Sequence, residues 1–172
     1  VIPIVTWMSK KVGKKKAFLI SQSISLVGYL MLWFLFIPGK PWMYIIALPF
    51  FSFGIGSLFT IMMSMTADVI DLDELNTGKR REGIFGAIYW WMVKFGFAIA
   101  GLLSGLILTL VGFDQSVSAQ APETLENLKL AYIIVPMTGT LIAIMVMSRY
   151  TLSEQKANEI RNQLELNQQR NI

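Results

Sequence analysis

Four long apolar stretches, almost free of charged residues, constrain this chain more than any other feature of its sequence. A helix that crosses a bilayer needs about 20 apolar residues, and residues 17–37, 42–67, 84–113 and 130–148 all come close to that length or exceed it. Lys94 is the only charged side chain in any of them. Inside lipid, backbone N–H and C=O groups must bond within the protein, as they do in helices. The sequence therefore predicts an all-α, polytopic membrane protein.

The composition agrees with this prediction and argues against several functions. The chain is 54% hydrophobic and 15% charged, and its net charge of +4 comes from short basic clusters at the ends of apolar runs. A nucleic-acid-binding domain would instead carry a basic face, so we expect no nucleic acid partner. The chain has no Cys and no His, which removes thiolate nucleophiles, imidazole bases and the usual zinc ligands. We expect no catalytic residue, no metal site and no cofactor.

The chain begins within an apolar segment, "VIPIVTWM". This segment has neither the basic start nor the small-residue cleavage site of a signal peptide. We expect residues 1–8 to be the end of a further transmembrane helix, and the sequence to be the C-terminal piece of a longer protein.

Basic residues mark alternate connections between the apolar stretches. Segments 9–16, 68–82 and 149–172 carry most of the lysines and arginines, and positively charged loops stay in the cytoplasm. We therefore predict a basic cytoplasmic loop at 9–16, a charged cytoplasmic loop at 68–82, an extracytoplasmic loop at 114–129 and a cytoplasmic tail. The protein is predicted to be multi-pass, in the plasma (inner) membrane, with a cytoplasmic C-terminus.

The tail, residues 149–172, is predicted to be helical. Thr151 and Glu154 match a capping box, and Ile160 and Leu164 belong to a thin apolar stripe. Such a helix either lies solvated near the membrane surface or binds a partner.

The segment 68–82 allows three interpretations. It is a solvated, charge-balanced loop, or a carboxylate site for a cation, or one side of an ion-pair network. Its acids lack the alternating ligands and terminal glutamate of a calcium loop, which argues against metal. Ion pairs matter more when several of them form a network that differs between two conformations.

This segment also carries a resemblance to a known family. "ADVIDLDELNTGKRREG", followed by an apolar helix with a central lysine, resembles the loop between helices ten and eleven of the glycoside–pentoside–hexuronide:cation symporters, the melibiose permease-like family of the major facilitator superfamily. "WMSKKVGKKK" resembles the basic loop between helices eight and nine of that superfamily. The resemblance implies that the chain runs from the end of helix eight through helix twelve of a twelve-helix transporter. It places a cytoplasmic gate at Asp68, Asp71, Glu74 and Arg80, with Leu72 where members often carry Tyr.

The unpaired Lys94 is the most informative residue of the third stretch. On a helix, its face holds small residues and Trp90, while the opposite face holds large apolar residues including Ile99 and Leu103. The large face suits lipid, and the small face suits another helix or a cavity wall. A lysine near the bilayer centre costs about 2.5–3.5 kcal/mol, and no stretch offers an acid at this depth. Lys94 therefore needs a partner in missing N-terminal helices or in bound substrate, unless backbone carbonyls satisfy it.

The resemblance also implies a sugar site next to Lys94. Tyr89, Trp90 and Val93 match substrate-lining positions of helix eleven, Phe59 matches an aromatic of helix ten, and Lys94 matches the helix-eleven lysine near the cation and sugar sites. Family members carry smaller polar residues in place of the first two, and ordinary packing is the alternative for each aromatic.

These observations predict a secondary active transporter that carries a sugar or glycoside together with Na⁺ or H⁺ by alternating access. Its partners would be a small-molecule substrate, membrane lipid and the missing N-terminal helices. The same fold carrying a lysophospholipid or another amphiphile is the alternative. A membrane enzyme or a structural membrane subunit is the remaining option.

Overall fold

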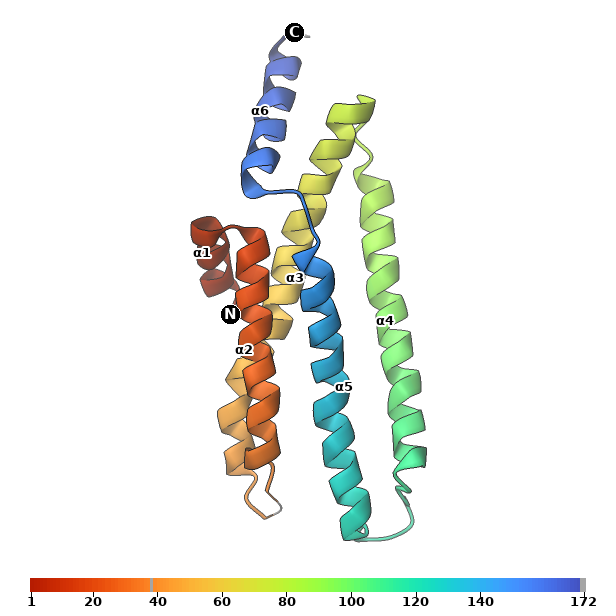
Figure 1. Cartoon of the computed structure of the whole chain (residues 1–172). Helices are drawn as coiled ribbons and strands as arrows, with labels where there is room; N and C mark the ends of the chain where they lie inside the picture. The colour runs from red at the N-terminus through yellow and green to blue at the C-terminus, as the bar shows by residue number, and fades with distance from the viewer. Residues whose placement is uncertain (38, 171–172) are drawn as a thin grey trace.

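A computed structural model describes residues 1–37 and 39–170, which fold into helices joined by short connections (Figure 1). The helices are α1 Ile2–Val12, α2 Lys14–Leu35, α3 Trp42–Thr77, α4 Glu82–Leu110, α5 Pro122–Ser148 and α6 Glu154–Arg170. In the described part of the chain no strand occurs, and α2, α3, α4 and α5 are each long and apolar enough to cross a membrane. The all-α, multi-span prediction is therefore confirmed.

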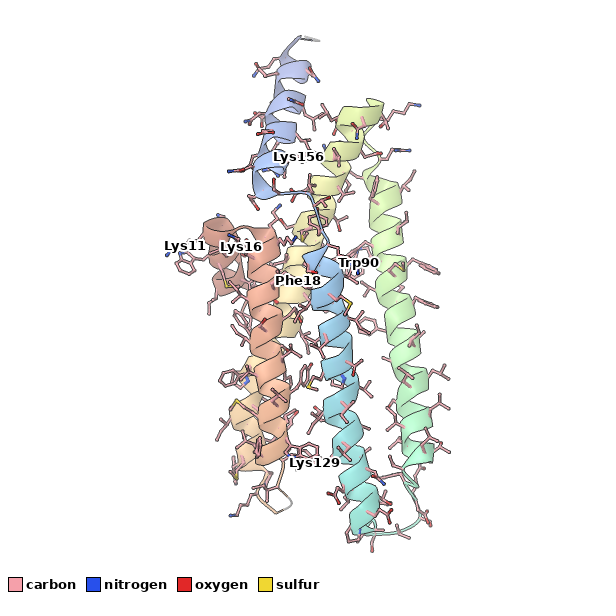
Figure 2. All side chains as sticks on the ribbon, in the orientation of Figure 1. Lys11, Lys16, Phe18, Trp90, Lys129 and Lys156 are labelled. Atoms are coloured by element: carbon pink, nitrogen blue, oxygen red, sulfur yellow. The ribbon has the colours of Figure 1, made fainter. Side chains whose placement is uncertain are left out.

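The helix α4 stands apart from the rest of the bundle. None of its residues is buried, whereas α2 and α3 each contribute eight buried residues. Figure 1 shows α4 separated along most of its length from α2 and α3, with α5 as its neighbour, and Figure 2 shows side chains on its outer side projecting into open space. The helix that carries Lys94 is thus the most exposed span of this part of the protein.

Small residues bring α2 and α3 into close contact. A Cβ atom built on Gly54 would lie 2.4 Å from the Cβ of Ser25, and one on Gly28 would lie 2.7 Å from the Cβ of Phe50. The Gln22 side chain donates a hydrogen bond of 2.9 Å to the carbonyl oxygen of Gly54. Close backbone approach through Gly and Ser, with polar side chains bonded across it, is how helices associate in lipid. These contacts make α2 and α3 the rigid pair on which the other helices pack.

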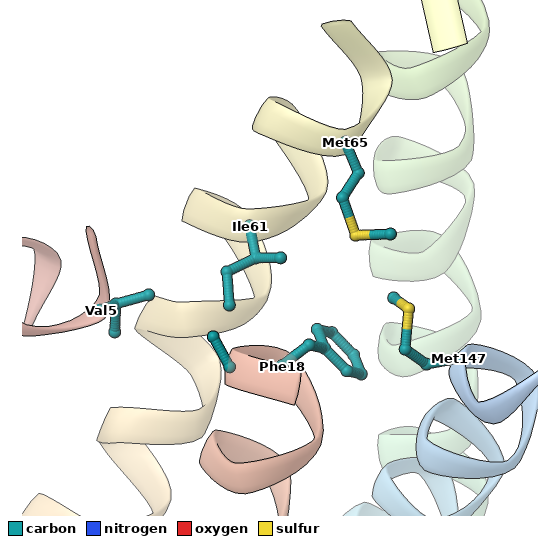
Figure 3. Packing of buried hydrophobic residues seen from close by; sticks show 6 residues of the cluster. Val5, Phe18, Ile61, Met65 and Met147 are labelled. Atoms are coloured by element: carbon teal, nitrogen blue, oxygen red, sulfur yellow. The ribbon is translucent and has the colours of Figure 1, made fainter. Parts of the chain in front are cut away.

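Two buried clusters complete the core. One joins α1, α2, α3 and the end of α5 through Val5, Phe18, Ile61 and Met147 (Figure 3). The other lies further along the bundle, between α2, α3 and α5, and consists of Tyr29, Leu32, Ala47, Phe51 and Ile133. The helices α1 and α5 are therefore held by the α2–α3 pair, and α4 has no residue in either buried set.

Several helix ends differ from the expected boundaries. Residues 68–77, expected in a loop, continue α3 to Thr77, where Gly78 ends the helix at φ 67° and donates its N–H to the carbonyl oxygen of Glu74. Residues 122–129, also expected in a loop, form the first turns of α5, with Pro122 in the first turn. Hydropathy marks where lipid ends, and these helices extend beyond that boundary. In the tail, Ser153 rather than Thr151 caps α6, accepting a hydrogen bond of 3.3 Å from the N–H of Lys156.

Candidate functional site: an ionic network and a membrane lysine

The candidate gate residues lie at one end of the bundle, which we call the charged end. It contains the turn at Gly13, the α3–α4 turn at 78–81 and the α5–α6 connection at 149–153, and it is the upper end in Figure 1. The extension of α3 from residue 68 to Thr77 carries four acidic side chains into this region, because the helix continues instead of unravelling.

Asp68 is the buried centre of the charged end. Its side chain is only 5% exposed, and it accepts a hydrogen bond of 2.6 Å from Lys14 and one of 3.1 Å from Arg161. Lys14 begins α2 and also reaches the carbonyl oxygen of Ser64 at 3.3 Å. A buried carboxylate is tolerated when it is paired and hydrogen-bonded in this way. Asp68 thus links three helices: α2, α3 and α6.

Arg80 forms a second group of ion pairs at the α3–α4 turn. Its guanidinium donates to Glu74 and Glu82 at 2.6 Å each and to Asp71 at 3.3 Å. The bond to Glu74, and after it the bond to Glu82, raise the pKa of Arg80 above its ordinary value. Since Glu74 lies on α3 and Glu82 begins α4, the arginine fixes the corner between the two helices.

Arg161 connects the two groups. Its guanidinium reaches Asp71 at 3.7 Å as well as Asp68. Three of the four predicted gate residues, Asp71, Glu74 and Arg80, therefore lie together, and Asp68 joins them through the tail. Sequence reasoning missed Lys14 and Arg161 as partners of Asp68, although both belong to basic segments that it assigned to the same side of the membrane.

The connection after α5 is held at the same end. The ammonium of Lys15 donates hydrogen bonds of 2.8 Å to the carbonyl oxygens of Ser148 and Tyr150. These bonds satisfy carbonyls at the end of α5 and place a cation at the negative end of its dipole. The hydroxyl of Tyr150 is buried, and no described residue forms a hydrogen bond with it. Burial, and secondarily the charge of Asp68, raise the pKa of Tyr150.

Lys94 lies far from this network. It is exposed near the middle of α4, and no residue of the described ranges forms an ion pair or side-chain hydrogen bond with it. The other side of α4 borders a cavity of about 630 Å³, shared with α5 and with Tyr29 and Phe51 behind it. Leu103, which lines this cavity, is nine residues from Lys94 and so about 180° around the helix. The face of α4 with large apolar side chains, which we expect to meet lipid, therefore lines part of the cavity. The face that carries Lys94 points away from the cavity.

The predicted substrate residues are divided between α3 and α4. Trp90 is 50% exposed and meets Tyr89 edge-on, with ring centroids 5.4 Å apart. The hydroxyl of Tyr89 is buried and has no hydrogen-bond partner within the described residues. Val93 and Phe59 are half-buried, and Phe59 is on α3, outside the residues that line the cavity. The structure therefore groups Tyr89, Trp90, Val93 and Lys94 on two turns of α4 and leaves Phe59 on another helix.

A metal site is not apparent. In residues 1–37 and 39–170, no group of three or more acidic side chains is arranged to hold a metal ion.

Comparison with known proteins decides the family. The family profile described as "MFS/sugar transport protein" matches residues 1–154. The chain belongs to this family. The resemblance to the glycoside–pentoside–hexuronide:cation symporters is confirmed, and the chain belongs to the major facilitator superfamily.

Several curated relatives carry transport names. The "Glucuronide carrier protein homolog" of Escherichia coli (strain K12) is 31% identical over 158 residues, which are 92% of this chain and 34% of the relative. The "Isoprimeverose transporter" of Lactiplantibacillus pentosus is 30% identical over 142 residues, 80% of this chain and 29% of the relative. The "Putative glycoside/cation symporter YagG" of Escherichia coli (strain K12) is 30% identical over 114 residues, 66% of this chain and 25% of the relative.

The chain spans about a third of the length of the curated relatives that it matches most extensively. No solved structure matches it with significance.

Proposed function

We propose that the full-length protein is a secondary active transporter that moves a sugar or glycoside together with Na⁺ or H⁺ by alternating access. Membership of the MFS/sugar transport family and the symporter and carrier names of the relatives support this proposal. In such transporters two halves rock around a site near the middle of the membrane. The present chain would supply part of the C-terminal half, from the end of helix eight through helix twelve.

Lys94 is the observation that carries the proposal. An intramembrane lysine costs about 2.5–3.5 kcal/mol at the bilayer centre, and the face that bears it is open in the described part of the chain. Its distance from the start of α4 at Glu82 is 12 residues, or about 18 Å at the helical rise, which is too far for the ammonium to reach the charged end. An ammonium in this position is suited to an acidic partner on a helix outside this chain, and to coupling the cation site to the sugar site.

The neighbouring aromatic residues would contribute the sugar contacts. Carbohydrates need flat apolar surfaces for the ring and a few polar groups for the hydroxyls. We propose that Trp90 and Tyr89 provide these surfaces, with Val93 beside them and Phe59 on α3. The buried hydroxyl of Tyr89 has no hydrogen-bond partner within the described residues, and a sugar hydroxyl that reached it would supply one.

The network at the charged end would be the cytoplasmic gate. Asp68, Asp71, Glu74 and Arg80 tie α3 to α2, α6 and the start of α4 through exposed and half-buried ion pairs. The exposed pairs among them are individually weak. A network of them that forms in one conformation and opens in another biases the two states, as alternating access requires.

The test is transport by the full-length protein in vesicles. Counterflow with a panel of glycosides, with and without a Na⁺ or a proton gradient, would identify the sugar and the ion. We expect Lys94→Val to insert normally and to lose cation-driven uptake, and Lys94→Arg to retain part of it because the charge is kept. Normal coupled uptake by Lys94→Val would refute the role of Lys94. Inhibition of uptake by lysophospholipids but not by any glycoside would refute a sugar as the substrate.

A further inference from the structure

Five lysines surround the turn at Gly13, and the structure divides them into two groups. Lys14 is engaged with Asp68, and Lys15 with carbonyl oxygens at the end of α5. The other three are exposed, and none of them has an ion-pair partner in the described part of the chain: Lys10, Lys11 and Lys16. Three cations without an ion-pair partner among the described residues thus lie at one corner of the bundle, which we call the basic corner.

The turn brings these cations together. Gly13 is the single residue between α1 and α2 and adopts φ +85°, a conformation that favours glycine. Lys10 and Lys11 occupy the last turn of α1, and Lys16 the first turn of α2. Figure 2 shows Lys11 and Lys16 on the side of the bundle that α1 and α2 form, away from α4. The basic corner is therefore separate from the Arg80 pairs and from Lys94.

The surface of α1 changes from apolar to cationic along the helix. Ile2, Ile4 and Trp7 are all more than half exposed. The ammonium of Lys11 lies 5.0 Å from the centre of the Trp7 ring. Ile4 and Lys11 are seven residues apart, about 10 Å along the axis. Along α1, exposed isoleucines are followed by a tryptophan and then by lysines. In a membrane, the isoleucines would contact acyl chains, the tryptophan the membrane interface, and the lysines the lipid headgroups.

We infer that the basic corner binds the headgroup of an anionic phospholipid. Three ammonium groups without acidic partners complement a phosphate of net negative charge, and the isoleucines beneath them provide a surface for its acyl chains. A free phosphate would use the lysines alone and would gain nothing from the apolar surface of α1. Basic side chains at an anionic membrane surface contribute roughly a fivefold change in binding each, so three together are worth on the order of a hundredfold.

The experiment measures lipid binding rather than transport, so its result is independent of the proposed symport. The full-length protein is placed in nanodiscs of phosphatidylcholine with or without phosphatidylglycerol, and retained lipid is counted by native mass spectrometry. The variant Lys10→Gln/Lys11→Gln/Lys16→Gln removes the three cations without touching any ion pair. The control Lys79→Gln removes an exposed lysine at the α3–α4 turn, at the same end of the bundle but away from α1.

We expect the wild type and the control to retain phosphatidylglycerol in preference to phosphatidylcholine, and the triple variant to lose most of this preference. Added salt should weaken the retention in the wild type, since exposed charges are screened. Equal retention of phosphatidylglycerol by the triple variant would overturn the inference. If a low concentration of inorganic phosphate displaced the retained phosphatidylglycerol, and retention did not depend on the acyl chains, the proposal that a lipid occupies the basic corner would be overturned.

Discussion

Replacing Asp68 with Asn should loosen the charged end more than any other single change there. The substitution keeps the size of the side chain and removes its charge. Lys14, whose side chain is only 16% exposed, would then be left without a counter-ion. Breaking a buried pair by removing one partner costs about 3 kcal/mol or more. Arg161 is 48% exposed, so losing its bond to Asp68 adds less than about 1 kcal/mol.

These magnitudes predict an order among variants. Asp68→Asn should lower the stability of the full-length protein by about 3–4 kcal/mol, and Arg161→Gln by less than about 1 kcal/mol. The double variant Lys14→Met/Asp68→Leu should recover much of the loss, because replacing both partners by apolar groups leaves no buried charge. Thermal unfolding in detergent would give the order.

Hydrogen exchange tests where the effect acts. Ala157 and Ile160 are the buried contacts of α6, and Arg161 follows them, so amides of α6 should exchange faster in Asp68→Asn and in Arg161→Gln. Amides of α4 should change little, because the Arg80 pairs do not include Asp68. Equal destabilisation by Asp68→Asn and Arg161→Gln would refute the reasoning, since it would mean that burial of Lys14 does not matter.

Two further changes follow from the structure. Gly54→Ala should destabilise the α2–α3 pair by about 1–3 kcal/mol through overpacking. Gly83→Ala, at a position where no described atom lies within 4 Å of the added Cβ, should be neutral or slightly stabilising. Thermal melting curves of the two variants, measured in parallel, compare them, and equal losses of stability would contradict close α2–α3 contact. Tyr150 has a raised pKa in the folded state, so its contribution to stability is complete below pH 10, the unfolded value, and is lost as pH rises through the folded pKa. Tyr150→Phe should therefore flatten the fall in melting temperature above that pH and cost little at neutral pH, since the hydroxyl has no partner; a steeper alkaline fall in the variant would contradict this.

The sequence predicts the spans because the hydropathy of each stretch is a local property. It does not predict the pairing of Asp68, because Lys14 is 54 residues before it and Arg161 is 93 residues after it. The basic segments showed that these residues would lie on one side, but only packing selects which lysine is buried. The α2–α3 contact did have a local signal, since Ser21, Ser25 and Gly28 recur at helical spacing.

Hydropathy does not predict the last turns of α3. Residues 68–77 are too polar for lipid, yet nothing in them breaks a helix before Gly78. Asp68, Asp71 and Glu74 recur at three-residue spacing; Asp71 and Glu74 meet Arg80, while Asp68 faces Lys14. A charged segment next to a span is therefore better read by its helical periodicity than by its hydropathy.

The position of α4 connects the two parts of the candidate site. It contains no proline from Glu82 to Leu110, whereas α3 and α5 contain Pro49 and Pro136. A helix without a break transmits displacement along its length. None of its residues is buried, and its first residue, Glu82, pairs with Arg80 at the charged end. Opening the Arg80 pairs would free the end of the same continuous helix on which Lys94 lies about 18 Å away. The proposed gate and Lys94 are thus joined by one continuous helix, along which we predict that a change at one reaches the other.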